Sequence, residues 1–150
     1  MKAASFPQAF LFTGPKGTGK TSTSRILGAM LNDDQNQATI RNLFFKHKKP
    51  TAPLLEPNPQ TERSQHIFAG ESYLVQELDA ASNRRIDDVR ALKDQIQLAP
   101  IDGLIKVYIL DEVHMLTTEA FNALLKMLEE PPPHVVFILA TTELDKVPTT

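Results

Sequence analysis

The residues best suited to chemistry form one glycine-rich run, Gly14-Pro15-Lys16-Gly17-Thr18-Gly19-Lys20-Thr21-Ser22. The run fits the G-x-x-x-x-G-K-[ST] pattern of a phosphate-binding P-loop, whose backbone N–H groups curl around a polyphosphate. We predict that this run binds ATP, with the Lys20 ammonium on the terminal phosphates and the Thr21 hydroxyl on Mg²⁺. An apolar segment precedes the run and a helical pattern follows it, which is the setting the motif requires.

Two adjacent acids supply the second half of such a site. Asp111 and Glu112 end an apolar run at 107–110, and parallel strands present their carboxyl ends to ligands at one edge of a sheet. We predict that Asp111 holds Mg²⁺ through water and that Glu112 polarises the attacking water. His114 follows closely, and we expect it to pack beside the site because Glu112 already serves as the base.

Alternating apolar runs and helical patterns predict an α/β fold with a parallel sheet covered by helices. Strands are expected at 9–12, 73–79, 105–110 and 135–140, and helices at 22–31, 86–96 and from 117 or 118 to about 130. Ser82 or Asn83 is the expected cap of the helix at 86–96. The last strand ends in Thr141-Thr142, a polar pair placed to sense the terminal phosphate or position the water.

The segment from 32 to 72 departs from this rhythm. It holds four prolines and many Asn, Gln and Lys residues, and only 40–45 looks able to pack. We expect an irregular, mobile, proline-rich excursion on the surface rather than a folded subdomain.

The bulk properties exclude several classes of protein. With 41% hydrophobic and 23% charged residues, the composition is that of an ordinary globular domain. The net charge of −2 rules out a whole-protein basic field, so any nucleic-acid contact must be a local patch. The chain has no cysteine, which excludes disulfides and thiolate metal sites. With no signal peptide or membrane-spanning run in view, the cytoplasm is the expected compartment and no membrane partner is expected.

Five separated blocks carry a resemblance to a known family. They are F-T-G-P-K-G-T-G-K-T-S at 12–22, L-D-A-A-S-N at 78–83, L-D-E-V-H-M-L at 110–116, F-N-A-L-L-K at 121–126 and L-E-E-P-P at 128–132. In order and spacing they resemble the gamma/tau subunits of bacterial DNA polymerase III, the AAA+ ATPases of sliding-clamp loaders. The resemblance covers about residues 6–31 and 73–148.

The resemblance implies a motor that couples ATP to the loading of a sliding clamp on primer–template DNA, alongside other clamp-loader subunits. It makes Lys20 and Thr21 the Walker A pair and Asp111 and Glu112 the Walker B pair. It places Thr142 at the sensor 1 position, and it implies that Arg84 and Arg85 contact the DNA backbone. Lys20, Glu112 and Thr142 are thus the expected catalytic set.

Three departures from the family pattern qualify this expectation. No cysteines stand at 32–72 where the family binds zinc, and His47 and His66 are too few to replace them, so zinc is not expected. We do not expect residues 1–150 to include the family's upstream adenine-pocket segment. We also do not expect them to include its downstream Ser-Arg-Cys block, last core strand, helical lid or collar. We therefore expect residues 1–150 to form a partial AAA+ domain with a bare apolar edge at 9–12. The chain then reads as a fragment, a shortened gene product or a degenerate reading frame, with slow or absent hydrolysis on its own.

Other functions remain open at this point. The chain can be an interaction or nucleotide-binding fragment without turnover, a clamp-loader delta-prime-like subunit, or another P-loop enzyme such as a small kinase or helicase. The presence of both Lys20 and Glu112 favours an ATPase, because a non-hydrolysing subunit has no need for both residues. The turn after Glu129 and Glu130 is a further surface that an assembled ring could place against a neighbour.

Overall fold

The computed structural model describes residues 7–15, 19–46, 53–82, 85–101 and 103–147. The strands are β1 (Ala9–Thr13), β2 (Val75–Asp79), β3 (Lys106–Asp111) and β4 (Val135–Thr141). The α-helices are α1 (Lys20–Asn32), α2 (Gln37–Ile40), α3 (Glu62–Ala69), α4 (Ile86–Ile96) and α5 (Thr118–Glu129). Short helical turns at 34–36, 41–45, 113–115 and 144–146 join some of these elements. The expected strands and long helices are thus present, with ends shifted by one or two residues.

All the strand pairs are parallel, and the order across the sheet is β1-β4-β3-β2. Thr13 lies opposite Thr141 and Asp79 lies opposite Asp111, so the four carboxyl ends meet at one edge. This arrangement confirms the predicted α/β fold with a parallel sheet. It also brings the P-loop strand next to β4 and one strand away from the acids.

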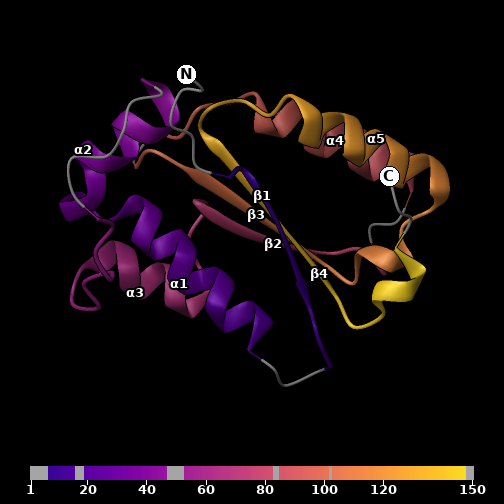
Figure 1. Cartoon of the computed structure of the whole chain (residues 1–150), viewed down its shortest axis with the longest axis horizontal. Coiled ribbons are helices and arrows are strands. Elements are labelled where there is room, and N and C mark those ends of the chain that lie inside the picture. Colours follow the sequence, from indigo (N-terminus) through magenta and orange to yellow (C-terminus); the bar gives the residue numbers. More distant parts are fainter. Residues whose placement is uncertain (1–6, 16–18, 47–52, 83–84, 102, 148–150) are drawn as a thin grey trace.

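Helices cover both faces of the sheet, with α1, α2 and α3 on one side and α4 and α5 on the other (Figure 1). The alternation of side chains along β3 explains how one strand serves two cores. Val107 and Ile109 pack towards α1 and α3, whereas Tyr108 and Leu110 pack towards α4 and α5. Burial of one such side chain contributes about 1.5–3 kcal/mol, so both helix layers are firmly held.

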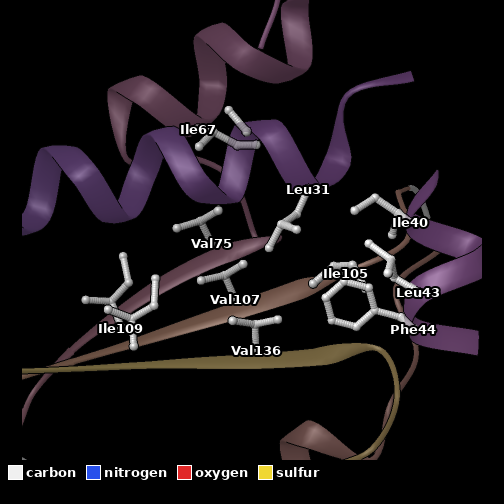
Figure 2. Packing of buried hydrophobic residues seen from close by; sticks show 12 residues of the cluster. Leu31, Ile40, Leu43, Phe44, Ile67, Val75, Ile105, Val107, Ile109 and Val136 are labelled. Atoms are coloured by element: carbon white, nitrogen blue, oxygen red, sulfur yellow. The ribbon is translucent and has the colours of Figure 1, made fainter. Parts of the chain in front are cut away.

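The structure corrects the expectation of an irregular excursion at 32–72. Ile40, Leu43 and Phe44 share one helical face and are buried, and Phe44 lies beside Ile105 at the amino end of β3 (Figure 2). Ile67 of α3 packs into the same cluster. The apolar residues are few but periodic, and tertiary packing outweighs the polar composition around them.

Only part of that segment is irregular. Residues 53–60 form no helix or strand, and three of its prolines lie there. Asn36 anchors this stretch with two hydrogen bonds. Its side-chain amide donates to the Leu55 carbonyl at 2.8 Å, and its Oδ1 accepts from the Leu55 N–H at 2.8 Å. The Thr61 hydroxyl then caps α3 by accepting from Ser64 N–H at 3.2 Å.

The expected cap of α4 is also corrected. Arg85, not Ser82, is the N-cap residue, and Asn83 lies outside the described residues. The Arg85 side chain has no acceptor, but its backbone N–H donates to the Asp88 carboxylate at 3.1 Å. The acid at the third helical position therefore accepts from the backbone N–H of the N-cap residue, which is one half of a capping box.

Strand β1 lies at the edge of the described sheet, as predicted for 9–12. It pairs with β4, and alternate residues are exposed, with Leu11 at 47%. None of the helices in the described part of the chain is long and apolar enough to cross a membrane.

Candidate nucleotide site

The P-loop begins where β1 ends, and a backbone hydrogen bond fixes that point. Gly14 N–H donates to the Thr141 carbonyl at 3.3 Å, which ties the start of the loop to the end of β4. Gly14 has φ 147° and Gly19 has φ 82°, conformations that residues with a Cβ rarely adopt. The loop's turns therefore need glycine at both ends. Lys16, Gly17 and Thr18 lie outside the described residues.

Lys20 opens α1 and reaches back over the loop. Its ammonium donates to the carbonyls of Gly14 at 2.8 Å and Pro15 at 3.0 Å. This holds a full positive charge at the start of a 13-residue helix, where the helix dipole adds its own. Thr21 follows in α1, though its side chain is outside the described part, and Ser22 is exposed. The start of the helix is thus suited to polyphosphate.

The two acids stand at the end of β3 and differ in backbone conformation. Glu112 N–H donates to its neighbour's carboxylate, Asp111 Oδ1, at 2.9 Å. Glu112 has φ 56°, and among the described residues it is the one non-glycine with positive φ. The Asp111 carbonyl accepts from Ala80 N–H at 2.9 Å, which links the acids to the end of β2. Because of this left-handed conformation, the Glu112 side chain does not follow the alternation of β3 side chains between the two faces of the sheet.

Thr142 meets Glu112 across the sheet edge. Its hydroxyl donates to Glu112 Oε2 at 3.1 Å, although the two residues are 30 positions apart. Together with the Gly14–Thr141 bond, this contact connects the P-loop, the acids and the end of β4. Glu112 and Thr142 of the predicted catalytic set are therefore in contact. Lys20, the first residue of α1, bonds to the loop that is tied to the end of β4.

His114 packs beside the site, as the sequence predicted, and its ring nitrogens make specific contacts there that the sequence did not predict. Its Nδ1 lies 2.8 Å from Thr141 Oγ1 and 3.3 Å from Glu112 Oε2, and its Nε2 lies 3.1 Å from Glu143 Oε2. The helical turn at 113–115 bends the chain back towards β4 and produces these contacts. The only signal in the sequence was the short distance of His114 from the acids.

The residues present suit Mg²⁺ of a nucleotide complex rather than a metal held by protein alone. Among the described residues, no three His, Cys, Asp or Glu side chains gather as a metal site. Mg²⁺ commonly takes one or two carboxylates and completes its shell with water and phosphate oxygens. Asp111, half-buried at the strand end, fits the role of that carboxylate.

The predicted DNA contacts are only partly described. Arg84 lies outside the described residues, whereas Arg85 is exposed at the start of α4. Asp87 and Asp88 follow in the first turn, and Asp87 pairs with Arg90 at 3.4 Å. Arg85 is thus available to a phosphate, but its surroundings are of mixed charge, so DNA contact stays a prediction.

Comparison with known proteins gives concordant matches. The model of a family described as "DNA polymerase III, delta subunit" matches residues 1–150. The DNA polymerase III subunit tau of Bacillus subtilis is 45% identical over 145 residues, which are 97% of this chain and 23% of that protein. The Escherichia coli subunit tau is 42% identical over 142 residues, 95% of this chain and 20% of that protein. The Mycobacterium tuberculosis (strain H37Rv) subunit gamma/tau is 43% identical over 147 residues, 98% of this chain and 23% of that protein.

The chain therefore spans about a quarter or less of these relatives. Among solved structures, a DNA polymerase III gamma subunit-related protein from Thermotoga maritima superposes with a TM-score of 0.60 at 22% identity. The match covers 99% of this chain and 38% of that one. This likeness supports the fold, a parallel sheet covered by helices on both faces.

Proposed function

Because this chain belongs to the DNA polymerase III, delta subunit family, we propose that it is the ATP-binding and ATP-hydrolysing core of a replication clamp-loader subunit. Its relatives of 42–45% identity carry the names tau and gamma/tau. The P-loop and the adjacent acids, which this core retains, give the proposal its chemistry.

Each residue of the site has a distinct task in this proposal. Lys20 and the start of α1 bind the β- and γ-phosphates of ATP, and Asp111 holds Mg²⁺ with Thr21. When bound, Mg²⁺ neutralises charge on the phosphates. Glu112 accepts the hydrogen of the attacking water, and Thr142 fixes the direction of the Glu112 carboxylate.

The observation that carries the proposal is the Thr142–Glu112 hydrogen bond of 3.1 Å. A threonine and a glutamate at the ends of a strand pair have no structural need to bond at a half-buried edge. In an ATPase the same contact sets the orientation of the base, and a fixed base is worth orders of magnitude in rate.

The wider role follows from the family and extends beyond the site. We propose that the subunit works with other clamp-loader subunits to place a sliding clamp on primer–template DNA. Arg84 and Arg85 then bind the DNA phosphates, in a contact that weakens with salt and ignores base sequence.

A titration of Mg·ATP by fluorescence tests the nucleotide site. Wild type is compared with Lys20→Ala and with Lys126→Ala, a matched control on the exposed side of α5. Binding that is lost in Lys20→Ala and kept in Lys126→Ala supports the proposal. Equal binding by all three proteins, or by none, contradicts it.

Hydrolysis is followed in the same samples, alone and after mixing with partner clamp-loader subunits. If Glu112→Gln abolishes ATP hydrolysis and leaves ATP binding unchanged, the chain is a working ATPase. The family description as delta subunit favours a second function, a nucleotide-binding subunit without turnover. Lys20-dependent binding with no hydrolysis in either setting would select that function.

A further inference from the structure

His114 occupies an unusual position for a residue with no assigned role. Its side chain is 5% exposed, yet both ring nitrogens face polar groups. Nδ1 faces Thr141 and Glu112, and Nε2 faces Glu143. One buried imidazole thus connects the proposed base to the loop that follows β4.

The hydrogen-bond donors around His114 define its neutral form. Thr141 Oγ1 accepts from Glu143 N–H at 3.0 Å, which leaves the Thr141 hydroxyl hydrogen free to point at Nδ1, 2.8 Å away. Nε2 then carries the ring hydrogen and donates to Glu143 Oε2 at 3.1 Å. In this tautomer an acceptor lone pair on Nδ1 faces the Glu112 carboxylate.

Protonation of the His114 ring turns Nδ1 from an acceptor into a donor towards the Glu112 carboxylate. With hydrogens on both nitrogens, Nδ1–H donates towards Glu112 Oε2 at 3.3 Å as well as towards Thr141. The charged groups facing the ring are Glu112 from the end of β3 and Glu143 from the loop after β4. Lys146 pairs with Glu143 at 3.0 Å. The neutral ring therefore leaves Glu112 to Thr142 and to the nucleotide, and the charged ring draws it back.

We propose that His114 is a positioning residue that sets the orientation of Glu112 and couples it to the loop at 143–146. The inference rests on the proposed ATPase function and deepens it. A shift of the loop moves Glu143, changes the hydrogen bond at Nε2, and so changes how Nδ1 meets Glu112. A neighbouring molecule that binds this exposed loop can therefore change the orientation of Glu112 through His114.

The kinetic test compares variants that separate polarity from packing. His114→Asn keeps a polar atom near the place of Nδ1, and His114→Leu keeps bulk without polarity. His134→Asn is the matched control, because His134 bonds to the Ile96 carbonyl at 2.8 Å at the other end of the sheet. We expect His114→Leu to lower kcat by about tenfold or more with ATP binding unchanged, His114→Asn to stay within about threefold, and His134→Asn to match wild type.

The comparison of His114→Asn with His114→Leu separates positioning from packing, because only the first variant keeps a polar atom near Glu112. If His114→Asn falls as far as His114→Leu, or if His114→Leu keeps full kcat, the positioning role is wrong.

A second measurement needs no turnover. The ring ¹⁵N shifts of His114 in the nucleotide-free chain report its tautomer, and we expect the Nε2–H form at pH 8. Glu112→Gln and Glu143→Gln should both move these shifts, because each changes a direct neighbour of the ring. Identical shifts in wild type and Glu112→Gln would overturn the inference. If wild type binds ATP but does not hydrolyse it, the proposed function fails, and these shifts alone decide the inference.

Discussion

Thr142 and Glu112 are joined by a hydrogen bond of 3.1 Å from hydroxyl to carboxylate, across the ends of β4 and β3. The contact forms because the parallel register places the carboxyl ends of neighbouring strands at one edge. The hydrogen bond from Gly14 N–H to the Thr141 carbonyl brings the P-loop to the same edge of the sheet. The P-loop, the end of β3 and the end of β4 are far apart in the sequence, and these two hydrogen bonds hold them together at one edge of the sheet.

Replacing Thr142 by Val removes the hydroxyl while keeping the branched shape. We expect kcat for ATP hydrolysis to fall by about tenfold to a hundredfold, because the base loses its fixed direction, with little change in ATP affinity. Thr142→Ser, which keeps the hydroxyl, should retain most of the rate. Equal rates for wild type and Thr142→Val would exclude this role.

Gly28 of α1 touches β2 too closely for any side chain. A Cβ at Gly28 would lie 2.4 Å from Val75 Cγ2, and Val75 is buried. Gly28→Ala should lower the free energy of unfolding by about 1–3 kcal/mol through overpacking, despite a helix-propensity gain of up to about 1 kcal/mol. Urea unfolding measures the change.

The double variant tests the cause of that loss. With Val75→Ala the contact disappears, so Gly28→Ala should become neutral or stabilising in that background. A loss of the same size in both backgrounds would assign the effect elsewhere.

Asn32 ties the end of α1 to the start of β3. Its amide donates to the carbonyls of Gly28 at 3.1 Å and Ile105 at 2.8 Å, and its Oδ1 accepts from the N–H groups of Leu104 at 3.1 Å and Ile105 at 3.0 Å. Asn32→Asp removes both donors and turns a buried charge towards two carbonyls. We expect about 2–4 kcal/mol of destabilisation by urea unfolding, against less than about 0.5 kcal/mol for Asn122→Asp on the surface of α5.

Tyr108 has a buried hydroxyl without a hydrogen-bond partner in the described structure. Its ring packs 6.0 Å from the Phe137 ring, and the side chain is fully buried. Tyr108→Phe keeps the ring and removes the unsatisfied group, so the free energy of unfolding at pH 7 should rise by about 1–2 kcal/mol. Thermal unfolding measures it, and a lower midpoint than wild type would contradict it.

Alkaline pH should enlarge that difference. Burial raises the pKa of Tyr108 to about 12 from the usual 10.0. The unfolded chain therefore loses its phenol proton first, and wild type loses stability as pH rises from 10 to 12. Relative to Tyr108→Phe, the loss should reach about 2–3 kcal/mol at pH 12.

Lys106 must be separated from this effect. Burial lowers its pKa, so deprotonation in the folded state adds stability as pH rises towards 10.5, the opposite sign. Because Lys106 is present in both proteins, the difference between wild type and Tyr108→Phe isolates the phenol. A difference that stays constant from pH 8 to 12 would mean that Tyr108 is not buried as described.

The strands and long helices were predictable because their signals are local. Continuous apolar runs such as 135–140 identify strands covered on both faces. The sequence placed the start of α5 at 117 or 118, and in the structure Thr117 is its N-cap, accepting from Ala120 N–H at 3.2 Å. The sequence alone also placed the P-loop and the acid pair at one edge of the sheet, since parallel strands align their ends.

The sequence failed to predict structure at places where the packing of only a few residues determines how the chain folds. Ile40, Leu43 and Phe44 fold a polar stretch onto the sheet, and proline content nearby concealed that short periodicity. The contact of His114 with Glu112 depends on a left-handed backbone turn and on β4 lying beside β3. Neither feature is encoded in the residues near His114, so the sequence predicted its place beside the site but not its contact with Glu112.

The left-handed conformation of Glu112 implies a conflict between folding and activity at a single position. A non-glycine residue held at φ 56° raises the energy of the folded chain by about 1–3 kcal/mol, and glycine would not. A library varied at position 112 and sorted only for resistance to heat or protease should therefore enrich glycine. The same library sorted for ATP turnover should return glutamate, so the two sorts would drive one codon in opposite directions.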